Sequence, residues 1–241
     1  MRLFAIGDLH MPGGDDKPMD VFGPQWDRHF LRISEAWRAT VGEEDTVLVP
    51  GDISWAMQLE NALPDLREIA ALPGRKILCK GNHEYWWSSI TRVRAALPEG
   101  MAALQFDAVD AGPCVICGTR GWTYPTEKNP LPPEDMKIFR RETQRLEMAL
   151  DRAEAMAGGK PILVMIHFPP RMNDQPDTPF TRILEAHRQV RTVVYGHLHG
   201  DAFAGGFSGE SRGIRYYPVS CDGIGFRPRE IPWPAMDPTD F

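Results

Sequence analysis

Two histidines stand one residue apart, His197 and His199, at the end of the apolar run TVVYGHLHG (residues 192–200). In extended backbone, side chains two positions apart point to the same side, so these two imidazoles should converge. A histidine that serves only the packing of the core needs no second histidine beside it. The spacing therefore predicts that the pair holds something in common.

Four other short apolar runs end in residues of the same chemical kind. They are RLFAIGD, TVLVPGD, KILCKGNH and PILVMIH, and the residues at or just after their ends are Asp8 and His10, Asp52, Asn82 and His83, and His167. Each residue alone has an ordinary interpretation as a turn residue, a helix cap or a hydrogen-bonded structural histidine. Because the pattern recurs at five run ends, a metal site is the better interpretation.

Strands and helices must bring these distant residues together. The unbroken apolar runs indicate strands covered on both faces, and their alternation with helical segments predicts an α/β arrangement around a largely central sheet. We expect helices over residues 25–39 and 133–157, and additional strands in 114–121 and 213–222. Ligands bind outside the carboxyl ends of strands in such sheets, so the site needs both halves of the chain. Residues 1–241 are therefore expected to form one domain.

The donor types select a class of metal. Imidazole, carboxylate and amide oxygen suit Mn, Fe, Zn, Co or Ni better than Ca or Mg. The candidate ligands are Asp8, His10, Asp52, Asn82, His167, His197 and His199. This set is too large for one tetrahedral zinc ion, but it suits two divalent ions that share a carboxylate.

A pair of divalent ions also indicates a reaction. Their charge exceeds that of two aspartates and a bridging hydroxide, so the centre favours an anionic phosphate ester. Bound metals lower the pKa of water toward ~7 and so supply a nucleophile. The chain has no G-x-S-x-G motif and no Walker A motif that would offer another route.

Five ordered blocks, GDLH (7–10), GD (51–52), GNHE (81–84), His167 and GHLH (196–199), resemble the calcineurin-like metallophosphoesterase superfamily. The resemblance implies a four-layer αββα sandwich, with two mixed β-sheets flanked by helices and a dimetal centre at the strand ends. We favour manganese for both ions, and the resemblance implies that one of them is bound by Asp8, His10 and His199. The second would be bound by Asn82, His167 and His197, and Asp52 would bridge both.

The resemblance also assigns roles beside the metals. His83 would stabilise the transition state or protonate the leaving oxygen, a contribution worth typically ~10²–10⁴-fold. Two positions depart from the family pattern: Trp55 stands where G-D-x-x-D commonly has its second acid, and Glu84 stands where G-N-H-D has aspartate. We expect the Glu84 carboxylate to orient the His83 imidazole, and neither departure predicts lost activity.

Candidate substrate contacts are less sharply indicated. Aromatic residues follow the motif blocks, and they either pack the sheet edge or offer a stacking surface for a ring, with Trp86 as one candidate. Arg171 and Arg120 are candidates to hold a phosphate oxygen. His29 and His187 fall in helical patterns away from strand ends, and we interpret them as ordinary surface or helix-face residues.

Composition limits the alternatives. The formal net charge of −6 argues against non-specific nucleic-acid binding, which rests on Lys and Arg contacts to phosphates. Four sparse cysteines do not make a disulfide framework, and Cys114 and Cys117 lie in a strand-like run where we expect a structural role. The short apolar runs predict neither a signal peptide nor a membrane span, so we expect a cytoplasmic protein.

The favoured function is a dimetal phosphoesterase in which a metal-bridging hydroxide attacks a phosphodiester or phosphomonoester of a small molecule or nucleotide. The alternative is a non-catalytic metal-binding scaffold on the same fold. The motifs leave the natural substrate and the oligomeric state open.

Overall fold

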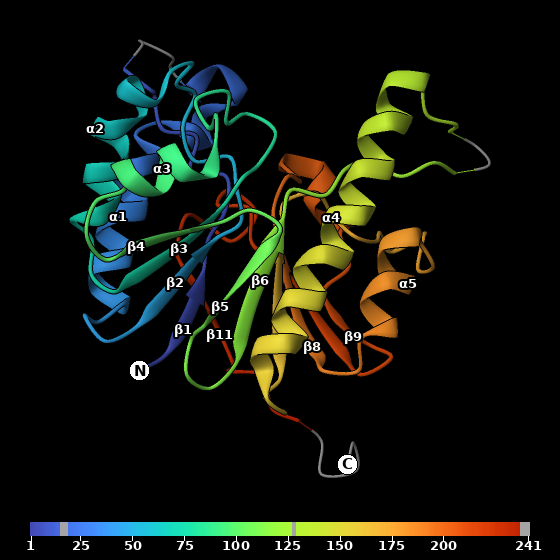
Figure 1. Ribbon diagram of the computed structural model, residues 1–241. Coiled ribbons are helices and arrows are strands. Elements are labelled where there is room, and N and C mark those ends of the chain that lie inside the picture. The colour runs from blue at the N-terminus through green and yellow to red at the C-terminus, as the bar shows by residue number, and fades with distance from the viewer. Residues whose placement is uncertain (15–18, 127–128, 237–241) are drawn as a thin grey trace.

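A computed structural model describes residues 1–14, 19–126 and 129–236, and it contains two β-sheets packed face to face (Figure 1). The first sheet has the order β11-β1-β2-β3-β4. Its parallel strands are β1 (Leu3–Ala5), β2 (Thr46–Val49), β3 (Arg75–Cys79) and β4 (Met101–Leu104), and β11 (Arg229–Ile231) runs antiparallel to β1.

The second sheet has the order β5-β6-β7-β8-β10-β9. Its parallel strands are β6 (Val115–Thr119), β7 (Ile162–Ile166), β8 (Val190–Tyr195) and β10 (Ile214–Pro218). The edge strands β5 (Asp107–Asp110) and β9 (Gly209–Ser211) are antiparallel to their neighbours. Both sheets are therefore mixed, as the resemblance implied.

Helices cover the two outer faces. The helices α1 (His29–Thr40), α2 (Leu59–Ala70) and α3 (Ile90–Ala96) lie against the first sheet, and α4 (Pro133–Ala157) and α5 (Pro179–Ala186) lie against the second (Figure 1). Short 3₁₀ turns span Met19–Phe22, Pro24–Trp26 and Gly200–Gly205. Three apolar clusters fill the spaces between the four layers. The predicted αββα sandwich is confirmed.

Local sequence explains the helix ends. α4 begins with Pro133 followed by acidic Glu134 and Asp135, and it ends at Gly158, whose φ of 53° is left-handed. The apolar periodicity of residues 25–39 places the start of α1 too early, since the helix begins at His29 and Trp26 lies in a separate 3₁₀ turn. Trp26 is nevertheless buried in the same cluster as Trp37.

The five apolar runs form strands, but they do not belong to one central sheet. β1, β2 and β3 are in the first sheet, whereas β7 and β8 are in the second. An unbroken apolar run indicates that a strand is buried on both faces. It does not show whether a helix or a second sheet covers each face. Cys114 and Cys117 face different layers of the core, and burial raises the pKa of both thiols, as fits a structural role.

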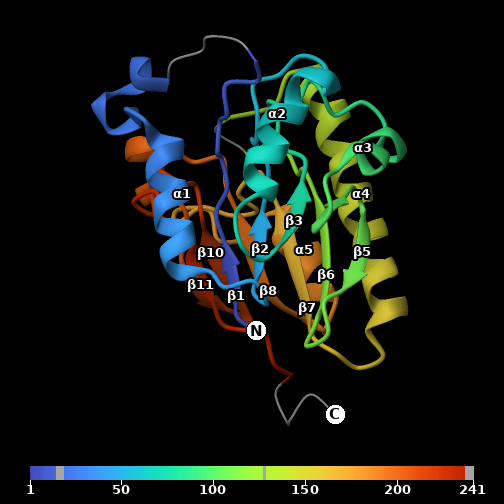
Figure 2. The same ribbon diagram turned by 90° about the vertical axis from the view of Figure 1, so that its left-hand side faces the viewer.

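The carboxyl ends of the parallel strands meet at one end of the molecule. β1, β2 and β3 all run away from the end at which the N-terminus lies (Figure 2). Just beyond β1 and β10, Gly7 forms a parallel bridge with Ser220 and joins the two sheets. Among the described residues, none of the helices is long and apolar enough to cross a membrane.

Candidate metal centre

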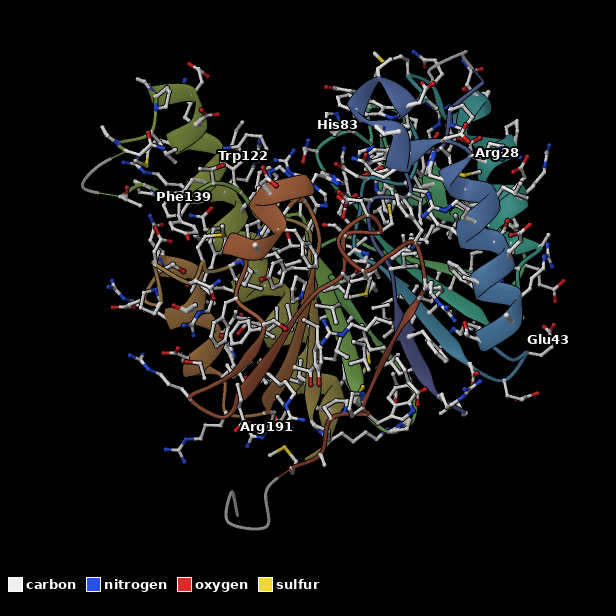
Figure 3. All side chains as sticks on the ribbon, turned by 180° about the vertical axis from the view of Figure 1, so that it is seen from behind. Arg28, Glu43, His83, Trp122, Phe139 and Arg191 are labelled. Atoms are coloured by element: carbon white, nitrogen blue, oxygen red, sulfur yellow. The ribbon has the colours of Figure 1, made fainter. Side chains whose placement is uncertain are left out.

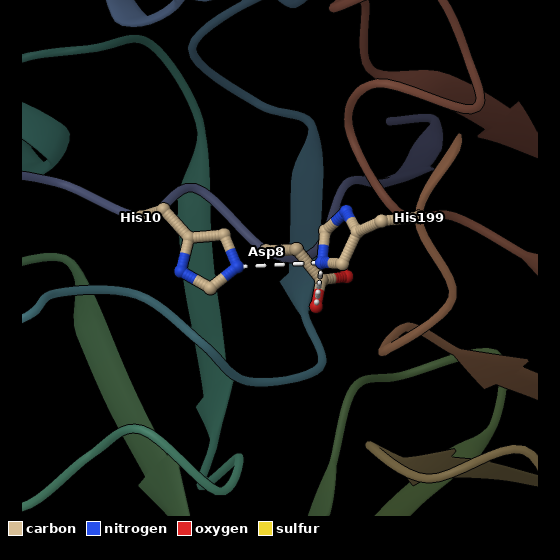
Figure 4. A group of neighbouring side chains, drawn as sticks. All are labelled: Asp8, His10 and His199. Carbon is tan, nitrogen blue, oxygen red and sulfur yellow. Dashed lines mark hydrogen bonds and ion pairs between the residues drawn. The ribbon is translucent and has the colours of Figure 1, made fainter. Parts of the chain in front are cut away.

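The first cluster of candidate ligands joins Asp8, His10 and His199 (Figure 4). The Nε2 atoms of the two imidazoles lie 3.3 Å apart, and Oδ1 of Asp8 lies 3.5 Å from Nε2 of His199. Asp8 is fully buried and His10 is 5% exposed. Two ring nitrogens and a carboxylate that converge in this way offer lone pairs to one cation, which is the donor set that first-row divalent metals take.

Asp222 holds His199 in position for this role. Nδ1 of His199 donates to Oδ1 of Asp222 at 2.9 Å, and the other carboxylate oxygen accepts from the N–H of Gly200 at 2.9 Å. With its proton on Nδ1, the ring presents a lone pair at Nε2. Sequence reasoning missed Asp222, although it ends the run SCD after β10 at the same edge of the sheet.

The second cluster joins Asp52, His167 and His197, and Asn82 lies among them. Oδ1 of Asn82 is 2.8 Å from Nε2 of His167 and 3.0 Å from Nδ1 of His197, and these two ring nitrogens are 3.3 Å apart. Nδ1 of His167 donates to the carbonyl of Pro50 at 3.0 Å, which leaves Nε2 directed at the cluster. These donors again suit a divalent cation.

Asp52 lies between the two clusters. Its Oδ2 atom is 3.3 Å from Nε2 of His167 and 3.9 Å from Nε2 of His10. A carboxylate in this position can reach a cation in either cluster. The structure thus brings together all seven candidate ligands, and the arrangement suits two ions that share Asp52.

The backbone that carries these side chains has an unusual conformation. Asp8, His10, Asp52 and His197 have positive φ angles of 58°, 44°, 52° and 73°. Left-handed backbone is unfavourable for non-glycine residues and persists where the surrounding structure imposes it, often at functional sites. Gly81 permits the close packing because an added Cβ there would overlap the Asp52 carboxylate.

Burial and charge set the protonation of the histidines. Burial lowers the pKa of His10 and of His197 to about 4 against the pull of the aspartates. For His167 and His199 burial acts in the same direction, but it is outweighed. Asp52 chiefly raises the pKa of His167 to about 9, and hydrogen bonds to Asp222 and Asp8 raise that of His199 to about 10. Protons on these two rings thus balance the buried aspartates, and a bound cation would displace them.

His83 lies beside the clusters and belongs to neither. Its Nε2 atom is 3.9 Å from Oδ2 of Asp52, and its ring centroid is 4.3 Å from that of Trp55. The side chain is 31% exposed, and burial lowers its pKa. Figure 3 shows His83 and Arg191 at opposite ends of the molecule. The carboxyl ends of the parallel strands meet at the His83 end. A partly exposed imidazole next to the clusters can exchange a proton with a bound substrate.

Glu84 does not orient the His83 imidazole, which corrects the expectation from the sequence. Its buried carboxylate accepts hydrogen bonds from the backbone N–H groups of Asp52, Ile53 and Gly81. Burial and the nearby charge of Asp52 raise its pKa to about 7. Glu84 therefore positions the two loops that carry Asp52 and Asn82.

The three predicted substrate contacts also lie elsewhere. Trp86 is 1% exposed and packs in the core beside Trp87, so it offers no stacking surface. Arg120 pairs with Glu142 at 3.2 Å, and the buried Arg171 stacks 3.8 Å above the centroid of the Phe207 ring. The structure places none of these three side chains in the wall of the pocket over the clusters.

That pocket has a volume of about 390 Å³, and both clusters contribute to its floor through Asp52 and three of the histidines. Apolar and aromatic side chains form much of its wall: Met19, Phe22, Trp26 and Trp55. Trp55 stacks on the His10 ring with centroids 4.9 Å apart and an interplanar angle of 22°. The residue that replaces the family's second acid therefore packs against a candidate ligand.

His29, interpreted from the sequence as a surface or helix-face residue, is buried, and its Nε2 atom donates to the carbonyl of Leu9 at 2.8 Å. This bond fastens α1 to the loop that carries His10. His187 lies away from the site and pairs with Glu154 at 2.9 Å.

Comparisons with known proteins show which family and which solved structures the chain is similar to. The model of the family described as calcineurin-like phosphoesterase matches residues 1–201. The Gene 66 protein of Mycobacterium phage L5 is 32% identical over 85 residues, which are 34% of this chain and 40% of the phage protein. The chain thus spans less than half the length of that relative.

Two solved structures share the fold at low identity. Phosphopantetheinyl hydrolase from Mycobacterium tuberculosis is 17% identical with a TM-score of 0.58, and the match covers 99% of this chain and 97% of that one. A protein of unknown function from Aquifex aeolicus is 17% identical with a TM-score of 0.50, and the match covers 95% of each chain. With the family model matched over residues 1–201, the chain belongs to the calcineurin-like phosphoesterase family.

Proposed function

We propose that the protein hydrolyses a small phosphodiester or phosphomonoester at a centre of two divalent metals. The observation that carries this proposal is the position of Asp52 between two clusters of candidate ligands, 3.3 Å from His167 and 3.9 Å from His10. Seven donors from both sheets converge there, more than one tetrahedral ion can use. Manganese is the favoured metal among Mn, Fe, Zn, Co and Ni.

Each group of residues has a defined part in this proposal. Asp8, His10 and His199 would hold one ion, Asn82, His167 and His197 would hold the other, and Asp52 would be shared. Bound divalent ions would supply a nucleophile by lowering the pKa of water toward ~7, and they would neutralise charge on the phosphate oxygens. His83 donates a proton to the leaving oxygen, and its position at the pocket, 31% exposed, supports that role.

The apolar wall of the pocket favours a phosphate ester whose organic group is apolar or aromatic. The side chains of Met19, Phe22, Trp26 and Trp55 stand over the clusters. Indole rings bury flat apolar groups well and stack on other rings. The phosphate would thus lie on the polar floor, with its organic group against the wall.

Hydrolysis of bis-p-nitrophenyl phosphate and p-nitrophenyl phosphate with Mn²⁺ tests the proposal. We expect turnover that needs the metal and that falls ~10²–10⁴-fold in His83→Ala. His187→Ala is the matched control, because His187 lies outside the site and pairs with Glu154. If protein with two bound metals cleaves neither ester, or if His83→Ala leaves turnover unchanged, the proposal is wrong, and the first result would favour the non-catalytic scaffold.

A further inference from the structure

A second pocket, of about 240 Å³, lies where the ends of β3, β4 and β6 meet α4. It shares no described lining residue with the pocket over the metal clusters. Four cationic side chains contribute to its wall, Lys80, Arg120, Arg141 and Arg145, and Glu142 is the one carboxylate among its described lining residues. This concentration of positive charge stands out in a chain whose formal net charge is −6.

Glu142 cannot balance all four cations. It is fully buried, and its Oε1 atom accepts from Arg120 at 3.2 Å and from Arg145 at 2.7 Å. Its Oε2 atom accepts from the hydroxyl of Thr119 at 3.0 Å. One carboxylate with both oxygens engaged leaves a surplus of positive charge in the pocket.

Several hydrogen-bond donors in the pocket are also unused. Nε of Arg120 is buried and has no partner among the described residues. The Arg141 guanidinium has no hydrogen bond or ion pair with another described residue, although Arg141 lines the pocket. Nζ of Lys80 donates to the carbonyl of Trp87 at 3.0 Å, and an ammonium has three donors.

Three of these cations are partly removed from water, whereas Arg141 is exposed. The Arg120 side chain is 18% exposed and the Arg145 side chain is 30% exposed. Like charges that share a partly desolvated space repel strongly, and a buried charge without a partner is costly. An anion in the pocket would relieve both penalties.

We propose that this pocket binds a phosphate-type anion. Guanidinium groups bind phosphate oxygens with paired N–H donors, and lysine adds a compact positive charge. The volume suits a phosphate group with a small substituent. The ligand is therefore inorganic phosphate or the phosphate of a small organic ester, and the two sources share the same recognition chemistry.

The pocket adjoins the second metal cluster through the backbone. Lys80 comes two residues before Asn82 in the chain. The carbonyl of Arg120 accepts hydrogen bonds from the N–H groups of His167 at 3.1 Å and Phe168 at 3.0 Å. The site is thus distinct from the catalytic pocket but lies next to the loops that carry its ligands.

Calorimetric titration of the metal-loaded protein with inorganic phosphate tests this site without relying on turnover. We expect Arg141→Ala to weaken one phosphate site about tenfold, because one charged pair of donors is removed. Arg140→Ala is the matched control. Arg140 is exposed on the same helix and does not line the pocket, and its replacement removes the same charge. Methylphosphonate, which cannot be hydrolysed, mimics an organic phosphate. Tighter binding of methylphosphonate than of inorganic phosphate would indicate an organic ester as the ligand, and weaker binding would indicate free phosphate.

A second variant separates this pocket from the metal centre. His197→Ala damages the second cluster, and we expect it to leave the Arg141-dependent phosphate site intact. If phosphate binding is lost in His197→Ala and unchanged in Arg141→Ala, the anion binds only at the metals and the inference is wrong. Absence of phosphate binding at millimolar concentrations would also overturn it. Neither result depends on whether the protein hydrolyses an ester.

Discussion

Replacement of Asp222 by alanine tests whether a residue outside the candidate ligand set controls one metal site. Its carboxylate accepts from Nδ1 of His199 at 2.9 Å and from the N–H of Gly200 at 2.9 Å. Without it, the His199 ring can rotate, and its proton is no longer held on Nδ1. Removal of such an outer partner typically lowers metal affinity about 10- to 100-fold, or about 1.4–2.8 kcal/mol.

The loss should be selective. Asp222 contacts His199 of the first cluster, whereas His167 of the second cluster is held by the carbonyl of Pro50. Titration with Mn²⁺, followed by calorimetry and by metal analysis after dialysis, should therefore show one weakened site and one unchanged site. Asp201→Ala, which removes an exposed carboxylate nearby in the turn Gly200–Gly205, is the control.

Two sites of unchanged affinity in Asp222→Ala would refute the reasoning, since His199 would then need no support from Asp222. Loss of both sites, with folding retained by circular dichroism, would refute the selectivity. It would mean that the clusters are coupled more tightly than their separate hydrogen-bond partners indicate.

Three further predictions follow from the geometry of the site. Asp52→Asn should weaken both metal sites together because its carboxylate lies between them; two fully occupied metals and unchanged turnover in this variant would exclude Asp52 as the shared ligand. Glu84→Ala leaves three buried N–H groups without their acceptor and should destabilise the fold by about 1–3 kcal/mol, measured by urea unfolding, whereas an unchanged midpoint would exclude the positioning role. In the metal-free fold the pKa of His167 is raised to about 9 and that of His199 to about 10. The protonated rings therefore stabilise the fold fully below pH ~6.5, and this stabilisation is lost as the pH rises through 9–10. The Tm of metal-free protein should thus fall from pH 7 to pH 10 and that of metal-loaded protein should fall less; parallel curves would contradict this assignment of protons.

The candidate ligands could be predicted because they follow strands. An apolar run that ends in Asp, Asn or His places a polar side chain at the carboxyl edge of a parallel sheet. The spacing of His197 and His199 predicted that extended backbone would point both rings to one side. In the structure β8 ends at Tyr195, His197 has a left-handed φ of 73°, and the two rings join different clusters. Strand periodicity is a local property, so it can be read without knowing which strands are neighbours.

The division of the strands between two sheets could not be read locally. β1 and β7 have similar apolar sequences, yet they belong to different sheets. Burial on both faces is the same signal whether a helix or a second sheet provides the cover. The resemblance to a known family, and not the periodicity, led to the four-layer arrangement.

The roles of the charged residues around the site depended on long-range contacts. Glu84 was expected to contact its chain neighbour His83, but its carboxylate is held by the backbone of Asp52 and Ile53, more than thirty positions away. Arg120 turns toward Glu142 on α4, and Trp86 enters the core. A side chain's partner is set by the elements that pack against it, and these are not its neighbours in sequence.

The sequence by itself determined the chemistry available to this protein: the donor types, their places at strand ends, and hence a centre for divalent metals. The family resemblance had already divided those donors between two metals, and the structure places them in the same two clusters. Only the tertiary structure decided that Asp222 supports His199 and that a basic pocket lies beside the site. The physical reason is that strand formation and side-chain alternation act over a few residues. Desolvation and charge balance act between groups that meet only when the sheets pack together.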